Sequence, residues 1–371
     1  MAKARRHLRA LSSASLLTRD ADGGYVLHDL VRAYAGELVE QERDDRLLAQ
    51  TRLLDYLRHN AYTAGRVLDT RPGREPADVP APGVARVVVD SREDALDWFR
   101  REEPAVVAAL RSLDDPGLLR HRTTFPIDWG AYYAVQGRWT AEIDVLRLGV
   151  EASLRLDDPV AITDNCATLA RALAQTGQIE EADVQIELML GQLDRIDLAT
   201  RGTAQRTIGW VRGRQGRYTE ALHHAREALS IFRALGDRSR EAREHNSVGW
   251  YLALKGEYRE AITACESAVP LLREVGNRRS EAATWDSIGY ATQRLGDLDA
   301  AVAHYEKSMQ LYEEVLDDYN QAEVLDHLAS AQLERGETEQ AQASWLRAGE
   351  LFSAHHAARA AEMWAKADTA S

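Results

Sequence analysis

The chain has 371 residues, of which 45% are hydrophobic and only 7% are aromatic, and its formal net charge at pH 7 is −13. This acidic balance argues against a protein that binds nucleic acid over most of its surface, because polyphosphate would be repelled. The apolar residues are mostly Ala and Leu, which favour helices over a sheet-rich core. A chain of this length forms one extended repeat array or two to three compact domains.

The two cysteines, Cys166 and Cys265, are too few for a disulfide framework and lack the spacing of a zinc site. We interpret both as small buried apolar residues in a reducing compartment. The sequence contains no apolar run of about 18 residues and no basic region followed by the apolar core of a signal peptide. We therefore expect a soluble cytoplasmic protein without a membrane partner.

Residues 1–45 predict a helix, a β-hairpin and a second helix. The segments SLLTR and YVLH are typical of short strands, and the DADGG between them is typical of a hairpin turn. Asp29 is placed to cap the following helix, because its carboxylate can accept hydrogen bonds from the free amides of the first turn. Helix, hairpin and helix in this order resemble the end of a winged-helix domain, here a remnant of one.

The stretch YVLHDLVRAYA at residues 25–35 resembles the last part of the nucleotide-switch module in NB-ARC (STAND-type) signal-transducing NTPases. The resemblance is confined to this hairpin and helix. It implies that His28 contacts the β-phosphate of bound ADP and that Asp29 helps to fix the loop. The phosphate loop, metal-binding Asp and sensor Arg of that family would all precede Met1.

The lysines exclude a phosphate-binding loop within this chain. Such a loop needs Gly-Lys-Ser/Thr, because the lysine ammonium reaches the terminal phosphates. None of the four lysines follows a glycine. We therefore expect no cofactor, with ADP or ATP held at His28 and Asp29 only if an upstream NTPase module exists. The lysines are Lys3, Lys255, Lys307 and Lys366.

A basic cluster of Lys3, Arg5, Arg6 and Arg9 precedes the hairpin. As a helix of a winged-helix fold it could approach DNA phosphates. The simpler interpretation is an exposed helix face. Nucleic acid is therefore not the expected partner of this chain alone.

Residues 46–119 are predicted to be a helical linker with a Pro/Gly-rich exposed loop at residues 70–86. Residues 45–69 are typical of one helix, and residues 91–110 of a pair of helices. The segment ALDWFRREEPAVVAAL is similar to the one that joins the switch to the repeats in actinobacterial transcriptional regulators of the NB-ARC type. Trp98 and Phe99 are expected to make core contacts with the first repeat.

Residues 120–371 repeat with a period of about forty residues, which indicates a stacked array. In each unit, apolar residues recur at helical spacing before and after a glycine that interrupts the two runs, so that each unit predicts a helical hairpin. Six such hairpins follow one another. The interrupting glycines are Gly137, Gly177, Gly216, Gly256, Gly296 and Gly336.

Gly209, Gly249 and Gly289 lie inside the first helices, where a glycine costs about 1 kcal/mol relative to alanine. We interpret them as points at which the second helix approaches closely, against small residues such as Ala221 and Ala261. This order of glycine, glycine, aromatic residue and alanines resembles the tetratricopeptide repeat. The resemblance implies an all-α solenoid of about six hairpins, whose terminal repeats depart from the pattern.

In tetratricopeptide arrays the first helices line the concave side. Two interpretations of their residues stay open: the aromatic residues, forty apart, pack between repeats, or they line a groove for an extended peptide or helix, where Asn246 can hold a backbone amide. Charge along the groove would run from arginine to carboxylate. The candidate groove residues are Arg206, Trp210, Arg243, Asn246, Trp250, Asp286, Tyr290 and Asp326.

No catalytic or metal site is expected. The histidine pairs at 223–224 and 355–356 are adjacent on helices, where neighbouring side chains point about 100° apart and do not readily share an ion. The paired aspartates lie between helices, as capping residues do. No nucleophile or metalloprotease motif is present. We therefore expect no enzyme activity.

Three hypotheses for function follow. The first is a regulatory scaffold that binds a protein or peptide in the concave groove, in signalling or transcriptional regulation. The second is the sensor half of an ATP/ADP-dependent switch whose nucleotide module belongs to a longer chain or a partner. The third is a DNA-binding transcriptional regulator that uses the winged-helix remnant.

Overall fold

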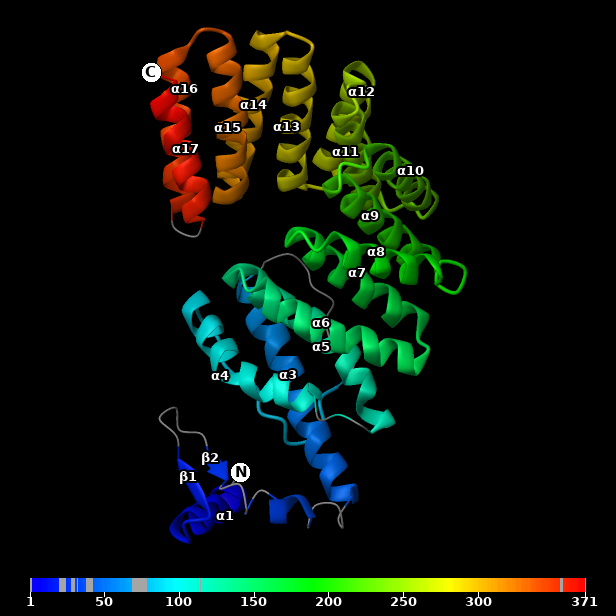
Figure 1. Cartoon of the computed structure of the whole chain (residues 1–371), viewed down its shortest axis with the longest axis vertical. Coiled ribbons are helices and arrows are strands. Elements are labelled where there is room, and N and C mark those ends of the chain that lie inside the picture. The colour runs from blue at the N-terminus through cyan, green and yellow to red at the C-terminus, as the bar shows by residue number, and fades with distance from the viewer. Residues whose placement is uncertain are drawn as a thin grey trace. The chain divides into compact units, whose positions relative to one another are not determined.

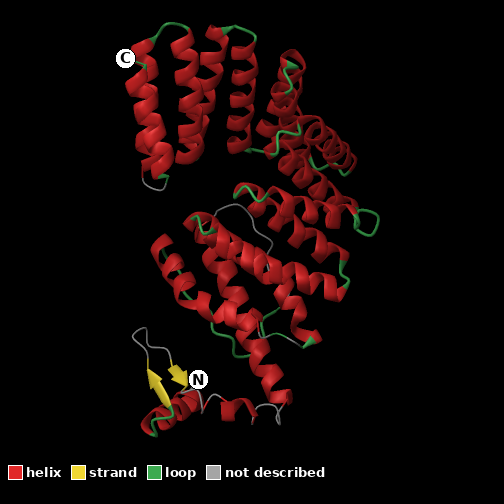
Figure 2. Cartoon of the chain, viewed as in Figure 1, coloured by secondary structure: helices red, strands yellow, loops and turns green. Residues whose placement is uncertain are grey.

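The computed structural model describes residues 2–19, 25–27, 31, 33–37, 43–68, 79–111, 113, 115–353 and 356–370. These residues are mostly helical, as the sequence predicted (Figure 2). The chain divides into two compact units, residues 1–168 and residues 169–371. His28 and Asp29 lie outside the described residues, so their predicted nucleotide and capping roles stay predictions.

The amino-terminal helix and hairpin are confirmed. Helix α1 (Ala2–Ser13) leads into strand β1 (Leu17–Arg19), which pairs antiparallel with β2 (Tyr25–Leu27). Leu17 lies opposite Leu27, and Arg19 lies opposite Tyr25. On α1, the side chains of Arg6 and Arg9 are exposed, as expected of a solvated helix face.

The predicted helix pair at residues 91–110 is wrong, because one continuous helix, α4 (Arg92–Arg111), spans the segment and contains Pro104. Proline removes one helical hydrogen bond and normally breaks or kinks a helix. In α4, Phe99 before the proline and Val106 and Leu110 after it are all buried in one core. Tertiary packing on both sides of Pro104 therefore maintains the helix.

Trp98 and Phe99 make the predicted core contacts with the first hairpin. The core also takes in α3 (Arg43–Leu68), α5 (Pro116–Gln136) and α6 (Trp139–Leu156). The ring of Phe99 stacks on Tyr132 with centroids 4.9 Å apart, and Trp98 lies 5.8 Å from Trp129. Aromatic pairs at these distances add to the free energy gained by burying the rings.

The six predicted hairpin turns are present within the described residues. The glycine at each turn has a φ between 61° and 87°, the left-handed region in which an L side chain is strained. After α5 and α6, the helices that these turns separate follow in order along the chain (Figure 1). They are α7 (Pro159–Gln175), α8 (Ile179–Leu190), α9 (Leu198–Arg214), α10 (Tyr218–Ala234), α11 (Arg238–Leu254), α12 (Tyr258–Glu274), α13 (Arg278–Arg294), α14 (Leu298–Glu314), α15 (Asp318–Glu334) and α16 (Thr338–Ser353).

The close approach predicted at the helical glycines is confirmed. A Cβ at position 209 would lie 3.1 Å from the carbonyl oxygen of Ala221, and one at position 249 would lie 2.9 Å from that of Ala261. At Gly289 the close neighbour is instead a side chain, the ring of Tyr305, whose Cε1 would be 2.7 Å from an added Cβ. The first and second helices are thus nearly in backbone contact in two hairpins.

Neighbouring repeats are joined by a recurring ion pair. Arg233 at the end of α10 donates to buried Glu241 at the start of α11 over 3.0 Å, and Arg273 donates in the same way to Glu281 over 2.7 Å. At the next junction the corresponding residue is Gln321, which is buried, and its side-chain nitrogen has no hydrogen-bond partner in the described part of the chain. The pair therefore occurs at two junctions and not at the third.

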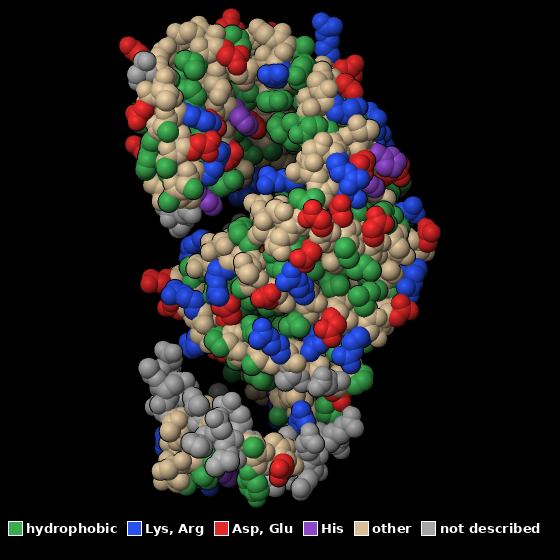
Figure 3. All heavy atoms as spheres, viewed as in Figure 1, with side chains coloured by type: hydrophobic (Ala, Val, Ile, Leu, Met, Phe, Trp, Pro, Cys, Tyr) green, Lys and Arg blue, Asp and Glu red, His purple; other side chains and the backbone are tan. Residues whose placement is uncertain are grey.

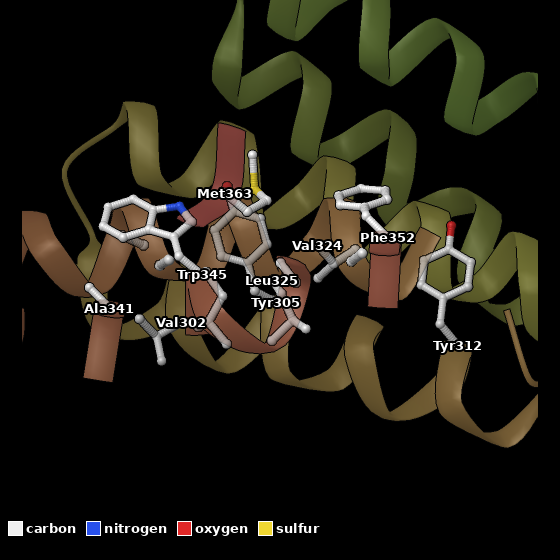
Figure 4. Packing of buried hydrophobic residues seen from close by; sticks show 14 of the residues in the cluster. Val302, Tyr305, Tyr312, Val324, Leu325, Ala341, Trp345, Phe352 and Met363 are labelled. Atoms are coloured by element: carbon white, nitrogen blue, oxygen red, sulfur yellow. The ribbon is translucent and has the colours of Figure 1, made fainter. Parts of the chain in front are cut away.

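A final helix, α17 (Ala357–Thr369), covers the last hairpin. Its Met363 is buried in one core with Tyr305, Trp345 and Phe352 from α14 and α16 (Figure 4). The sequence placed this segment in the array without predicting a separate helix. Helix α17 therefore covers an apolar face of α16 that would otherwise be exposed to solvent.

Gly249→Ala should lower the free energy of unfolding by about 1–3 kcal/mol, because the added methyl group would overlap Cys265 Sγ and press on the Ala261 carbonyl. Urea unfolding followed by circular dichroism measures this. The effect should shrink when Cys265 is also changed to Ala. A stabilised Gly249→Ala variant, which helix propensity alone would give, would contradict the close approach.

Candidate partner-binding groove

The first helices of the second unit face a common hollow. Helix α11 contacts α13 and α13 contacts α15, whereas among the described residues the second helices of neighbouring repeats meet sparsely at most. The first helices therefore lie on the inner side of the curve. Figure 3 shows this face hollowed, with hydrophobic, basic and acidic side chains around it.

Charges act across this hollow. Burial and Glu323 raise the pKa of Tyr319 at the start of α15, and the guanidinium groups of Arg359 and Arg214 oppose the rise. Arg214 belongs to α9 and Tyr319 to α15, three repeats along the array. Arg214 therefore lies near enough to Tyr319 to influence the pKa of its hydroxyl.

Basic side chains gather at the arginine end of the predicted groove. Arg206 is partly buried, and burial together with the neighbouring charges of Arg243 and Arg171 lowers the pKa of its guanidinium to about 10. Arg243, one repeat further on, is exposed. Its guanidinium makes no hydrogen bond or ion pair with any residue that the structure describes. Positive charge therefore accumulates on this part of α9 and α11.

Glu244, which the sequence did not single out, lies beneath these arginines. Its carboxylate is buried, and burial raises its pKa to about 7 although Arg206 and Arg243 oppose the rise. The Nε atom of Arg206 lies 3.9 Å from Oε1, too far for a hydrogen bond, and Ser247 opposes the rise in pKa only weakly. Glu244 is thus a weak counter-ion for the arginines, because attraction does not offset its loss of hydration.

The predicted aromatic stripe is divided in two. Trp250 and Tyr290 contact each other with centroids 5.3 Å apart and pack against the core of α10–α13. The indole of Trp210 lies instead near the guanidinium groups of Arg171 and Arg214, 5.6 and 5.9 Å from its ring centroid. All three aromatic side chains stay partly exposed, so that packing and ligand contact are compatible. Asn246 is also partly exposed on α11.

At the other end, the predicted carboxylates are already paired. Asp286 accepts a hydrogen bond from His327 Nδ1 over 2.8 Å. Asp326 accepts from Lys366 Nζ over 2.7 Å and from Trp345 Nε1, also over 2.7 Å. The expected run of charge from arginine to carboxylate is therefore incomplete, because His327 and Lys366 neutralise the acidic end.

The period of forty contained a signal for one of the missed residues. Arg206, Asn246, Asp286 and Asp326 occupy one position in successive first helices, and Lys366 on α17 is the next member of this series. His327 has no such signal, since the corresponding residue in the three preceding repeats is Thr or Ser. We call Arg206, Asn246, Asp286, Asp326 and Lys366 the charge column.

The adjacent histidines His223 and His224 have different surroundings on α10. His224 is partly buried, and its Nδ1 pairs with Gln205 Oε1 over 2.6 Å, whereas its neighbour His223 is exposed. Within the described ranges, no three His, Cys, Asp or Glu side chains are grouped so that they could hold a metal ion. In the same ranges, no helix is both long enough and apolar enough to cross a membrane.

The family model of the tetratricopeptide repeat matches residues 200–274 and 280–365. These helices are tetratricopeptide repeats. The predicted all-α repeat solenoid, with one β-hairpin before it, is thus confirmed.

Two curated proteins similar to this chain carry the same name, Regulatory protein AfsR. The one from Streptomyces griseus is 29% identical over 244 residues, and the one from Streptomyces coelicolor is 28% identical over 256 residues. Each match covers 63% of this chain and 24% of the relative. The chain therefore spans less than a quarter of the length of these regulatory proteins.

Among solved structures, the Rap protein complexed with Competence and Sporulation Factor is similar, with a TM-score of 0.50 at 16% identity. The match covers 76% of this chain and 87% of that one. Similarity at this level of identity shows a shared fold.

Glu244→Gln should stabilise the protein at neutral and higher pH. The folded pKa is raised from 4.5 to about 7, so the cost of the buried charge appears as pH rises above 4.5 and is complete above about 7. We expect the variant to be more stable by about 2–3 kcal/mol near pH 8 and by about 1 kcal/mol near pH 5. Urea unfolding at both pH values measures the difference in free energy of unfolding between the variant and the wild type. Glu241→Gln, which removes the acceptor of Arg233, is the matched control and should destabilise.

The His327–Asp286 pair should stabilise the groove most at low pH. Burial alone would lower the pKa of His327, but Asp286 raises it from 6.5 to about 9. The stabilisation is therefore fully present below 6.5 and is lost as pH rises through about 9. A third of the imidazole is exposed, so we expect solvent screening to leave about 1–2 kcal/mol.

Asp286→Asn isolates this contribution. Its destabilisation relative to the wild type, measured by urea unfolding, should be larger near pH 6 than near pH 10. A difference that does not change with pH would show that the pair does not depend on the imidazolium.

Proposed function

We propose that this chain is a non-enzymatic regulatory scaffold that binds a protein or peptide partner in the concave groove of its repeats. The observation that carries the proposal is the set of partly exposed aromatic and amide side chains on the first helices, Trp210, Asn246, Trp250 and Tyr290. On the same helices, the guanidinium groups of Arg214 and Arg243 have no hydrogen-bond or ion-pair partner among the described residues. Partly exposed Trp and Tyr rings give a ligand apolar area at low entropic cost.

The relatives support the regulatory part of the proposal. Both are named as regulatory proteins, and the match covers the greater part of this chain. The Rap protein of the same fold was solved with Competence and Sporulation Factor, so this architecture holds a partner in at least that protein. We propose that the present chain uses its repeats for protein recognition within signalling or transcriptional control in the cytoplasm.

A second candidate function is the sensor portion of an ATP/ADP-dependent NB-ARC switch of actinobacterial type. It is favoured by the helix and hairpin formed by α1, β1 and β2, which directly precede the His-Asp motif. The nucleotide module would come from a longer chain or a partner. Calorimetric titration of this chain with ADP should then show no saturable binding, whereas micromolar binding would place a nucleotide site within it.

The groove is tested by selecting binders from a displayed library of random linear peptides, with dissociation constants measured by fluorescence anisotropy. The variant Asn246→Ala/Trp250→Leu should weaken the selected peptides at least tenfold, about 1.4 kcal/mol, because it removes the amide and the indole while keeping apolar volume. Thr263→Ala/Ser267→Ala, on the outer face of α12, is the control and should bind normally.

Circular dichroism melts separate the two explanations of a loss. Weaker binding with a melting curve close to that of the wild type supports the groove. Binding unchanged in the Asn246/Trp250 variant would show that these residues serve repeat packing alone.

A further inference from the structure

We propose that the partner is an acidic peptide segment whose carboxylates bind at the arginine end of the groove, around Arg206, Arg214 and Arg243. The inference rests on the proposed function and specifies the chemistry of its ligand. It follows from which charges of the groove are already neutralised within the chain and which are not.

The basic end lacks sufficient counter-ions. Arg214 and Arg243 are exposed, and their guanidinium groups make no hydrogen bond or ion pair with any described residue. The Nε atom of Arg206 lies 3.9 Å from Glu244 Oε1, too far for a hydrogen bond. An arginine guanidinium matches the planar geometry of a carboxylate and can bind it through two parallel hydrogen bonds.

The acidic end offers no comparable attraction for a basic ligand. Asp286 and Asp326 are bound by His327 and Lys366, and Glu323 accepts from Arg359 Nη2 over 2.9 Å. A cationic partner would have to displace these internal cations. Among the described groove residues, the charges left without an ion-pair partner at Arg214 and Arg243 are therefore positive, although the chain is acidic overall.

An acidic peptide fits better than a nucleic acid. The net charge of −13 repels a polyphosphate that extends beyond the groove, whereas a short acidic segment stays inside it. Arg171 and Arg214 lie near the ring of Trp210, so this partly exposed indole is bordered by positive charge. The exposed guanidinium group of Arg214 beside the ring is well placed to pair with a side-chain carboxylate.

A second basic hollow on the outer face supplies a matched control. A cavity of about 530 Å³ between α10, α11 and α12 is lined by Arg226 and Arg259, whose guanidinium groups are likewise without a partner among the described side chains. Replacing these arginines changes the charge of the protein as much as replacing Arg214 and Arg243. It leaves the inner face unchanged.

The test uses a short fluorescein-labelled peptide rich in Glu and the same peptide with every Glu changed to Gln, both titrated with the full chain. The Glu peptide should bind at least tenfold more tightly than the Gln peptide, and this difference in affinity should decrease as the salt concentration rises. Arg214→Gln and Arg243→Gln should each weaken it about tenfold and leave the Gln peptide unaffected. Arg226→Gln and Arg259→Gln should change neither peptide. Circular dichroism confirms that each variant is folded.

The outcomes separate this inference from the proposed function. Equal binding of both peptides, with both lost in Asn246→Ala/Trp250→Leu, would keep the groove and overturn its preference for acidic ligands. If only the Arg226 and Arg259 variants lost binding of the Glu peptide, the site would lie on the outer face, and both proposals would be overturned. Binding of neither peptide, or displacement of the Glu peptide by a single-stranded oligonucleotide at lower concentration, would also overturn the inference.

Discussion

The second unit depends on the close packing of the two helices within a hairpin, which brings the two backbones nearly into contact at Gly209 and Gly249. At Gly249 the backbone of α11 comes so near α12 that even a methyl group would meet the Ala261 carbonyl. This approach fixes how one hairpin presents its outer surfaces to the next, because each repeat contacts only its neighbours. The curvature that places the first helices around one hollow is therefore determined inside each hairpin, by residues that never reach the groove.

The charge column shows how one position acquires different roles along a repeated structure. Arg206 has too few counter-ions, Asn246 is neutral, Asp286 is paired, and Asp326 is bound by Lys366, the last member. The same backbone site thus presents positive charge to solvent at one end of the array and closes an internal ion pair at the other. Repetition places the positions, and the local partners determine which charges remain available.

Much of the fold was predictable because glycines and apolar spacing report local backbone geometry. The turns at Gly216 and Gly256 are examples, since their positive φ follows from residue type. The continuous helix through Pro104 was not predictable, because contacts distant in sequence hold it. For the candidate groove, the sequence indicated which positions share the inner face, and its binding role stays a prediction. Its charge balance could not be predicted, because it depends on Glu244 and His327, residues without a periodic signal.

The junction between α14 and α15 has a mechanical consequence. The ion pairs that join Arg233 to Glu241 and Arg273 to Glu281 have no counterpart where Gln321 replaces glutamate. At this junction the first helices are joined instead, by Arg279 to Asp317 and by His327 to Asp286. The segment from α15 to α17 is therefore held through the groove face itself, so that loss of the imidazolium charge of His327 loosens this joint.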